Sequence, residues 1–196
     1  MALAYRYALS FSRPGIWVVC GVIASGKSTM ADALAAVLGI PVLKTDSIRR
    51  ELFRNTTKST EAADFGEGAY SPEATALTYG RLYNRTEAAL KRGRSVILDA
   101  TFSLKEQRDE VRRLAEIHRV PLNVIVCECR ERVIRQRLAD RGESGGISNA
   151  RLSHWDRFKH RFEDIEEMQG GRILRIDTEK PVEDNLKVVL NRYAYA

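Results

Sequence analysis

Short apolar runs alternate along the chain with longer segments whose apolar residues recur every three or four positions. The five runs are 16–20, 41–45, 95–98, 122–127 and 172–176. Runs of this length bounded by turn residues predict buried strands, and the segments between them predict helices. Strands that alternate with helices form parallel sheets covered on both faces. The pattern therefore predicts a three-layer α/β fold with a five-stranded parallel sheet.

Several helical segments carry recognisable ends. Ser71 precedes Pro72, which predicts a helix capped by Ser71, and Gly93 follows the basic end of the same segment. Ser103 and Glu106 have the spacing of a capping box, which predicts that the next helix begins at Ser103. A glycine-rich break at 141–146 separates two further helical segments. We expect the region of about 130–160 to form a small helical lid with a mobile loop.

A glycine-rich loop follows the first predicted strand. It reads Gly21, Val22, Ile23, Ala24, Ser25, Gly26, Lys27 and Ser28, and Thr29 continues into a predicted helix. This is the GxxxxGK[ST] pattern between a strand and a helix, in which backbone N–H groups and the helix start cradle phosphates. The loop predicts ATP binding through residues 21–29, with Lys27 on the β and γ phosphates and the Ser28 hydroxyl on Mg²⁺.

The third predicted strand ends at Asp99, which fits a carboxylate near the metal. The alternative is an aspartate that only caps the following turn. No glutamate follows Asp99, although many motor ATPases carry one there to activate water, and the chain has no NKxD pattern for guanine recognition. These absences favour a kinase over a motor ATPase or a GTPase.

Asp46 and Arg49 follow the second predicted strand, at the start of a helical segment. Ligands of open α/β sheets lie at the carboxyl ends of the strands, so both side chains should face the crevice beside the phosphate loop. A carboxylate there can accept the proton of an acceptor hydroxyl, and a guanidinium can hold an anionic group of the acceptor. The plainer alternative is that Asp46 only caps the helix.

Arginines crowd the segment 130–142, and Arg137 and Arg141 are one helical turn apart. Guanidinium groups beside a glycine-rich hinge suit a lid that neutralises charge on the transferring phosphoryl group. We expect Arg130, Arg132 and Arg135 to be solvated or paired with glutamate, as exposed arginines on helices usually are.

Composition and charge set the class of protein. With 44% hydrophobic and 30% charged residues, the 196-residue chain is too apolar for a disordered protein. No run approaches the ~18 apolar residues that cross a membrane, and three cysteines without CxxC spacing argue against disulfides and zinc. We expect one soluble, cytoplasmic domain over 1–196 with no membrane partner. The net charge of +6 is concentrated in 81–161, which favours an anionic ligand.

Four segments together resemble the P-loop kinase family that includes the 5'-hydroxyl polynucleotide kinase domain. They are Gly21–Ser28, Thr45–Arg49, Val96–Thr101 and Arg137–Gly142. The sequence is also similar to kinases grouped as AAA-type ATP-binding domains, and more distantly to zeta-toxin-like and gluconate-kinase-like enzymes. The resemblance covers 16–176 and implies a P-loop NTPase fold. It also implies that Asp46 is the general base, that Arg49 binds an acceptor phosphate, and that Arg137 and Arg141 contact the donor phosphates.

The expected activity is transfer of the γ-phosphoryl group from ATP, with Mg²⁺, to an acceptor hydroxyl. The leading acceptor is the 5'-hydroxyl of a nucleic acid, because of the D-x-x-R pattern at Asp46 and Arg49 and the basic middle of the chain. A small metabolite, sugar or nucleotide is the alternative. A hypothesis of another class is an ATP-hydrolysing switch, which the residue after Asp99 argues against. Tyr70 could stack on a base, whereas Tyr79 and Tyr83 have the spacing of packing residues.

Overall fold

The computed structural model describes residues 13–54, 68–144, 155–165 and 172–194. In chain order the elements are β1 (Ile16–Cys20), α2 (Lys27–Leu38), β2 (Val42–Lys44), α3 (Thr45–Phe53), the 3₁₀ turn η1 (Gly68–Tyr70), α4 (Pro72–Lys91), β3 (Val96–Asp99), α5 (Lys105–His118), β4 (Leu122–Glu128), α6 (Glu131–Ser144), α7 (Trp155–Arg161), β5 (Arg172–Asp177) and α8 (Val182–Ala194). All five predicted strands are present, within one residue at each end.

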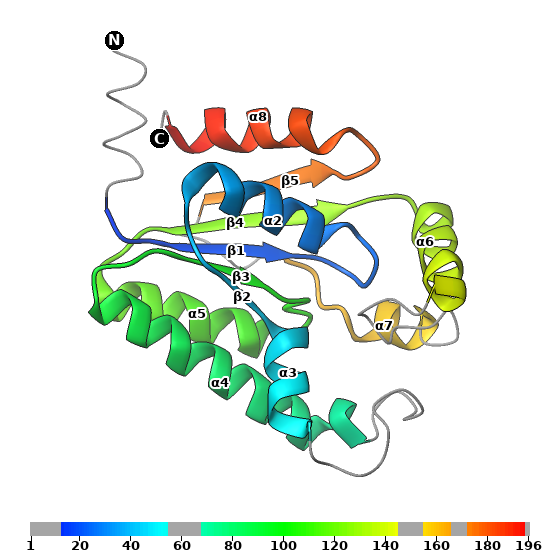
Figure 1. Ribbon diagram of the computed structural model, residues 1–196, viewed down its shortest axis with the longest axis horizontal. Helices are drawn as coiled ribbons and strands as arrows, with labels where there is room; N and C mark the ends of the chain where they lie inside the picture. Colours follow the sequence, from blue (N-terminus) through cyan, green and yellow to red (C-terminus); the bar gives the residue numbers. More distant parts are fainter. Residues whose placement is uncertain (1–12, 55–67, 145–154, 166–171, 195–196) are drawn as a thin grey trace.

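The strands form one parallel sheet in the order β2-β3-β1-β4-β5. Helices α2 and α8 cover one face, and α4 and α5 cover the other (Figure 1). The predicted three-layer fold is confirmed. Because β1 lies in the middle of the sheet, the loop that follows it emerges at the centre of the edge where the carboxyl ends of the strands meet.

Alternate residues of β1 supply the two main cores. Ile16, Val18 and Cys20 pack toward α4 and α5, whereas Trp17 and Val19 pack toward α2 and α8. This is the two-residue period of a strand buried on both faces. The Tyr193 ring meets Trp17 edge to face at 5.0 Å between centroids, and its hydroxyl donates to the carbonyl oxygen of Val124 at 2.9 Å. These contacts anchor α8 across the centre of the sheet.

Of the two helix starts predicted from capping residues, one is confirmed and one is wrong. Ser71 caps α4 by accepting a hydrogen bond from the N–H of Ala74 at 3.1 Å, as expected. The capping box of Ser103 and Glu106 is wrong, because α5 begins one residue later. The Gln107 side chain accepts from the N–H of Leu104 at 3.3 Å, and the Ser103 carbonyl instead accepts from Glu163. A contact from a distant segment therefore sets this helix start.

Helices α6 and α7 lie beyond the carboxyl ends of the strands (Figure 1). A third apolar cluster joins them to the loop after β1; it contains Ile23, Ala24, Ile134, Leu138 and Trp155. The predicted lid region thus packs on the phosphate loop itself. The glycine-rich break predicted at 141–146 is wrong for its first part, because α6 continues through Ser144; Gly145 and Gly146 lie outside the described residues. In the part of the chain that the structure describes, no helix is both long and apolar enough to cross a membrane.

Candidate active site

Two glycines of the loop after β1 have conformations that side chains resist. Gly21 has a φ of 134°, and a Cβ there would lie 2.4 Å from the carbonyl oxygen of Cys127. Gly26 has a φ of 87°, and a Cβ there would lie 3.1 Å from Cβ of Thr178. At Gly21 the backbone of Cys127 leaves no room for a side chain, and at Gly26 a side chain would be strained by the positive φ and would have to displace Thr178. The chain can therefore turn sharply out of the sheet and bring the start of α2 over the strand ends.

Lys27 is the first residue of α2 and lines the cavity described below. Its ammonium donates to the carbonyl oxygen of Val22 at 2.7 Å, across the curled loop. The first N–H groups of α2 have no partner within a helix, and they favour an anion at this end. Of the residues predicted to bind the donor, six line the cavity: Ile23, Ala24, Gly26, Lys27, Ser28 and Thr29.

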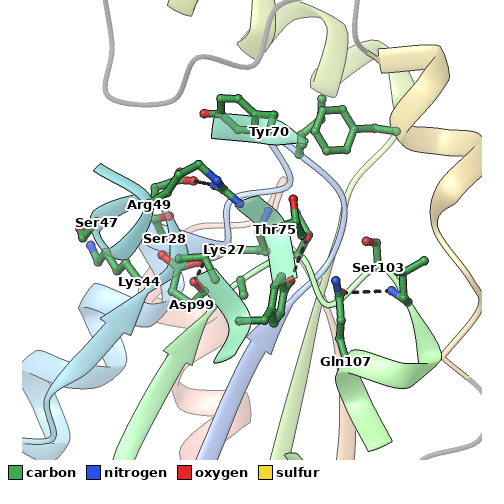
Figure 2. Close-up of a pocket in the computed structure, with 18 of the residues that line it drawn as sticks. Lys27, Ser28, Lys44, Ser47, Arg49, Tyr70, Thr75, Asp99, Ser103 and Gln107 are labelled. Atoms are coloured by element: carbon green, nitrogen blue, oxygen red, sulfur yellow. Dashed lines mark hydrogen bonds and ion pairs between the residues drawn. The ribbon is translucent and has the colours of Figure 1, made fainter. Parts of the chain in front are cut away.

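Asp99, at the end of β3, lies beside Ser28 and Lys27 (Figure 2) and is only 5% exposed. Burial raises the pKa of the Asp99 carboxyl above its ordinary value, although the Lys27 ammonium and a hydrogen bond from Ser28 oppose the shift. A buried carboxylate next to a hydroxyl offers the hard oxygen ligands that Mg²⁺ prefers, with phosphates completing the sphere. Ser28 and Asp99 therefore fit a magnesium ion.

We expect Asp99→Asn to separate folding from metal binding. Because the folded-state pKa is raised, ionising Asp99 costs stability once the pH exceeds that pKa, and the amide removes this cost. The melting temperature of the protein without nucleotide and Mg²⁺ should rise at pH 7. The Mg²⁺-dependent part of ATP affinity should fall about 10- to 100-fold. Calorimetry with and without EDTA measures both, and a lower melting temperature would contradict the argument.

The acceptor-side residues form a second group. The Arg49 guanidinium donates from Nη1 to Oδ1 of Asp46 at 3.1 Å and lies over the Tyr70 ring, 4.6 Å from its centroid. Its Nε is buried and has no partner among the described residues. Figure 2 shows Arg49 between Tyr70 and the group of Lys27, Ser28 and Asp99. Asp46 lies in the first turn of α3, after the capping residue Lys44, so the helix-cap alternative for Asp46 is wrong.

Both groups line one cavity of about 990 Å³. The rest of its lining comes from α4, from the loop between β3 and α5, from the first turns of α5 and from α7; it includes Thr75, Tyr79, Tyr83, Thr101, Ser103, Glu106, Gln107, Glu110, Phe158 and Arg161. Tyr79 and Tyr83 also pack as expected, since the Tyr79 ring contacts Phe102 and the Tyr83 hydroxyl donates to the Gln107 carbonyl at 3.1 Å. The residues predicted for the donor and for the acceptor therefore share one continuous cavity.

The two predicted lid arginines are Arg137, whose contacts the structure describes, and Arg141. Arg137 donates to the carbonyl oxygens of Ala24 and Thr178 at 3.1 and 2.8 Å, so its guanidinium braces the phosphate loop from behind and does not line the cavity. Arg141 lies in α6, but its side chain is outside the described part. Arg130 and Arg135 pair with Glu179 and Glu131, as expected for surface arginines.

Thr178 was missed by the sequence reasoning. Its hydroxyl donates to the carbonyl oxygen of Ser25 at 2.7 Å and accepts from Arg137 at 3.3 Å. The signal was present, because Thr178 directly follows β5 and the carboxyl ends of parallel strands surround the site. Lys44, at the end of β2, was missed in the same way. Its ammonium pairs with the Asp32 carboxylate at 2.7 Å, and both residues line the cavity.

The chain has curated relatives of similar sequence. An uncharacterized protein of Mycobacterium tuberculosis strain H37Rv is 31% identical over 145 residues, which are 74% of this chain and 27% of the relative. The chain thus spans about a quarter of that relative's length.

Solved structures share the fold. A protein of Chloroflexus aurantiacus with a suggested kinase assignment superposes with a TM-score of 0.72 at 23% identity, covering 92% of this chain and 96% of its own. The Mycobacterium tuberculosis APS kinase, solved with AMPPNP and APS, has a TM-score of 0.65 at 18% identity, covering 92% and 97%. The family profile described as an AAA domain matches residues 16–165. The chain therefore belongs to the AAA domain family and has the fold of the P-loop kinases.

Proposed function

We propose that this protein is an ATP- and Mg²⁺-dependent kinase that phosphorylates an acceptor hydroxyl. The observation that carries the proposal is the single cavity shared by the phosphate loop, the Ser28 and Asp99 pair, and the Asp46 and Arg49 pair. A nucleotide site alone would suit a switch or an ATPase. A carboxylate and a partly unpartnered guanidinium across the same cavity add what an acceptor requires.

The residues divide the reaction between them. The loop 21–29 holds the ATP phosphates through backbone N–H groups, and Lys27 moves from the Val22 carbonyl to the β and γ phosphates. Mg²⁺, held by Ser28 and Asp99, would neutralise charge on the phosphates. Asp46 orients the acceptor hydroxyl and takes its proton as the oxygen attacks the γ phosphorus, while the bond from that phosphorus to the β,γ-bridging oxygen breaks and ADP leaves. Arg49, held by Asp46 and Tyr70, offers the part of its guanidinium that lines the cavity to an anionic group of the acceptor.

For Arg137 we propose support of the donor loop, which its bonds to Ala24 and Thr178 favour. Direct contact with a phosphate would require the Arg137 guanidinium to leave both carbonyls. Arg141, one turn further along α6, remains the proposed lid contact to the donor phosphates. Closure of the lid around residues 130–160 would then exclude water from the reaction.

Two classes of acceptor are proposed for this site. A polynucleotide 5'-hydroxyl is supported by the D-x-x-R pattern and by Arg50 and Arg161 in the cavity lining. A compact alcohol is favoured by Glu106 and Glu110 in the same lining, because carboxylates repel a phosphate backbone. The APS kinase of the same fold was solved with a small ligand of that kind, APS.

Transfer from γ-labelled ATP decides between them. The protein is incubated with 5'-hydroxyl oligonucleotides and, separately, with a panel of sugars, nucleosides and small phosphorylated alcohols. Label in oligonucleotides supports the first acceptor class, and label only in small molecules ends the polynucleotide proposal. Rapid release of phosphate that no acceptor alters would favour the ATP-hydrolysing switch instead.

Trp155 gives a direct signal for nucleotide binding. It is one of two tryptophans and packs against Ile23 and Ala24 of the phosphate loop, whereas Trp17 is in the sheet core. In a Trp17→Phe background, we expect ATP with Mg²⁺ to shift the Trp155 emission in a saturable way, since the loop must adjust around the phosphates. A fluorescence titration measures it, with Lys27→Ala as the weakly binding control. Calorimetric binding without any change in emission would contradict the contact.

A further inference from the structure

Arg108 is a buried cation that the proposed chemistry does not use. It lies in α5, is 1% exposed, and is absent from the cavity lining. Its guanidinium donates to three backbone carbonyl oxygens, those of Phe102 at 2.9 Å, Glu163 at 3.2 Å and Asp164 at 3.1 Å. An apolar side chain would fill this space without the cost of burying a charge. The reason for a buried arginine at this position therefore lies in the segments that its guanidinium holds together.

Arg108 joins two segments that are about sixty residues apart in sequence. One is the loop between β3 and α5, and the other is the stretch that follows α7. The N–H of Glu163 donates to the Ser103 carbonyl oxygen at 2.9 Å, and the Glu163 carboxylate accepts from the N–H of Lys105. Nη1 of Arg108 donates to both segments, and Nη2 adds the bond to Asp164; a lysine lacks this second nitrogen and its fixed planar geometry. We call this set of hydrogen bonds, which joins Arg108, the loop 102–105 and residues 163–164, the latch.

The loop side of the latch is strained. Phe102 has a φ of 48°, which is uncommon for a bulky residue, and it is fully buried. Its N–H donates to the Tyr79 hydroxyl at 3.0 Å, while its carbonyl oxygen accepts from Arg108. Such a conformation persists only where the surroundings fix it. Its consequence is the placement of Thr101 and Ser103, on either side of Phe102, in the cavity wall.

The other side of the latch fixes the end of α7. Glu163 and Asp164 come two and three residues after Arg161, the last residue of that helix. Arg161 and Phe158 both line the cavity. The latch thus sets how α7 approaches the loop of Thr101 and Ser103. The donor loop touches this loop through the Gly21 N–H, which donates to the Thr101 carbonyl oxygen at 3.3 Å; its residues Ala24 and Ser25 are held by a different set of bonds, from Arg137 and Thr178.

From this geometry we propose that Arg108 is a positioning residue that holds the α7 end of the lid region against the loop between β3 and α5, so that both form one acceptor wall. The role rests on the proposed kinase function, because the wall matters only if an acceptor binds there. Arg108 touches neither donor nor acceptor. Its loss should loosen the acceptor side and leave the phosphate loop unchanged.

Hydrogen exchange tests the latch without any acceptor. In Arg108→Lys, we expect exchange in peptides covering 102–105 and 162–165 to be about tenfold faster or more, since hydrogen bonds from a charged donor are lost. Peptides covering 21–30 should be unchanged. Arg112→Lys is the matched control, because Arg112 is on the same helix with exposed ion pairs to Asp109 and Glu116. Unchanged exchange in both latch peptides, or equal acceleration everywhere, would overturn the proposal.

Kinetics then tests the functional consequence. With an acceptor found by ATP labelling, Arg108→Lys should raise the acceptor KM about tenfold or more, with the ATP KM within about twofold. Equal increases in both KM values would refute a role on the acceptor side. Should Arg108→Lys not fold, Glu163→Ala decides, because it removes one exposed bond of the latch and leaves the core intact. Faster exchange at 102–105 in that variant supports the latch, and no change rejects it. If no acceptor is ever labelled, the kinase proposal fails while the exchange result still stands.

Discussion

Asp46→Asn should lower the turnover number by about 10²-fold or more while leaving ATP affinity within about twofold. The amide can still accept the hydrogen bond from Arg49 that Oδ1 of Asp46 now accepts at 3.1 Å, so the geometry of the acceptor side is kept. What it loses is the ability to take a proton from the acceptor hydroxyl. Steady-state kinetics with the labelled acceptor and a separate ATP titration measure the two quantities.

Asp109→Asn is the control for this substitution. Asp109 lies on α5, pairs with Lys105 and Arg112, and does not line the cavity. Its turnover should match that of the unchanged protein. Equal turnover in Asp46→Asn and Asp109→Asn would reject Asp46 as the general base and reduce its role to holding Arg49. A large loss of ATP affinity in Asp46→Asn would instead show that the carboxylate shapes the donor site.

Gly21→Ala is expected to have the largest effect on folding. The added Cβ would lie 2.4 Å from a backbone carbonyl oxygen of Cys127, which no side-chain rotation can relieve, at a φ of 134°. Strain and overlap together should lower the free energy of unfolding by about 3 kcal/mol or more, and the displaced loop should lose measurable ATP binding. Urea denaturation and an ATP titration of the folded fraction test both effects.

Gly39→Ala separates strain from overlap. Gly39 ends α2 with a φ of 65°, and a Cβ there meets nothing within 4 Å. This variant should lose only the ~1–2 kcal/mol of a left-handed residue and should bind ATP normally. If the two variants were equally stable, the close approach of Gly21 to the end of β4 would not restrict the loop.

The donor half of the site could be read from sequence because it is local. Residues 21–29 are contiguous, and the strand before them and the helix after them fix their geometry. Asp99 and the pair of Asp46 and Arg49 follow strands, so the rule that ligands meet at strand ends brought them to the same edge. The helix start at Ser103 could not be read in this way, because Glu163 from a distant segment competes for the Ser103 carbonyl.

The contacts of the arginines, too, could not be predicted from local sequence. The sequence contains 32 lysines and arginines, and helix position alone gave no means of telling their roles apart. The phosphate contact of Arg137 stays a prediction, while its guanidinium donates to the carbonyls of Ala24 and Thr178, which the sequence did not indicate. Arg108 carries no motif that sets it apart in the sequence, yet it is 1% exposed. Each outcome depends on which backbone carbonyls the fold leaves within reach of the side chain.

The sequence by itself determined the α/β fold, the phosphate cradle and the residues that meet at the strand ends, because these follow from periodicity and from contiguous turns. Only the tertiary structure decided which charges face the cavity and which hold its walls. The physical reason is that a long side chain spans several ångströms, so its partner is chosen by packing between distant segments. Arg49 over Tyr70 and Arg108 between Phe102 and Glu163 are both settled in that way.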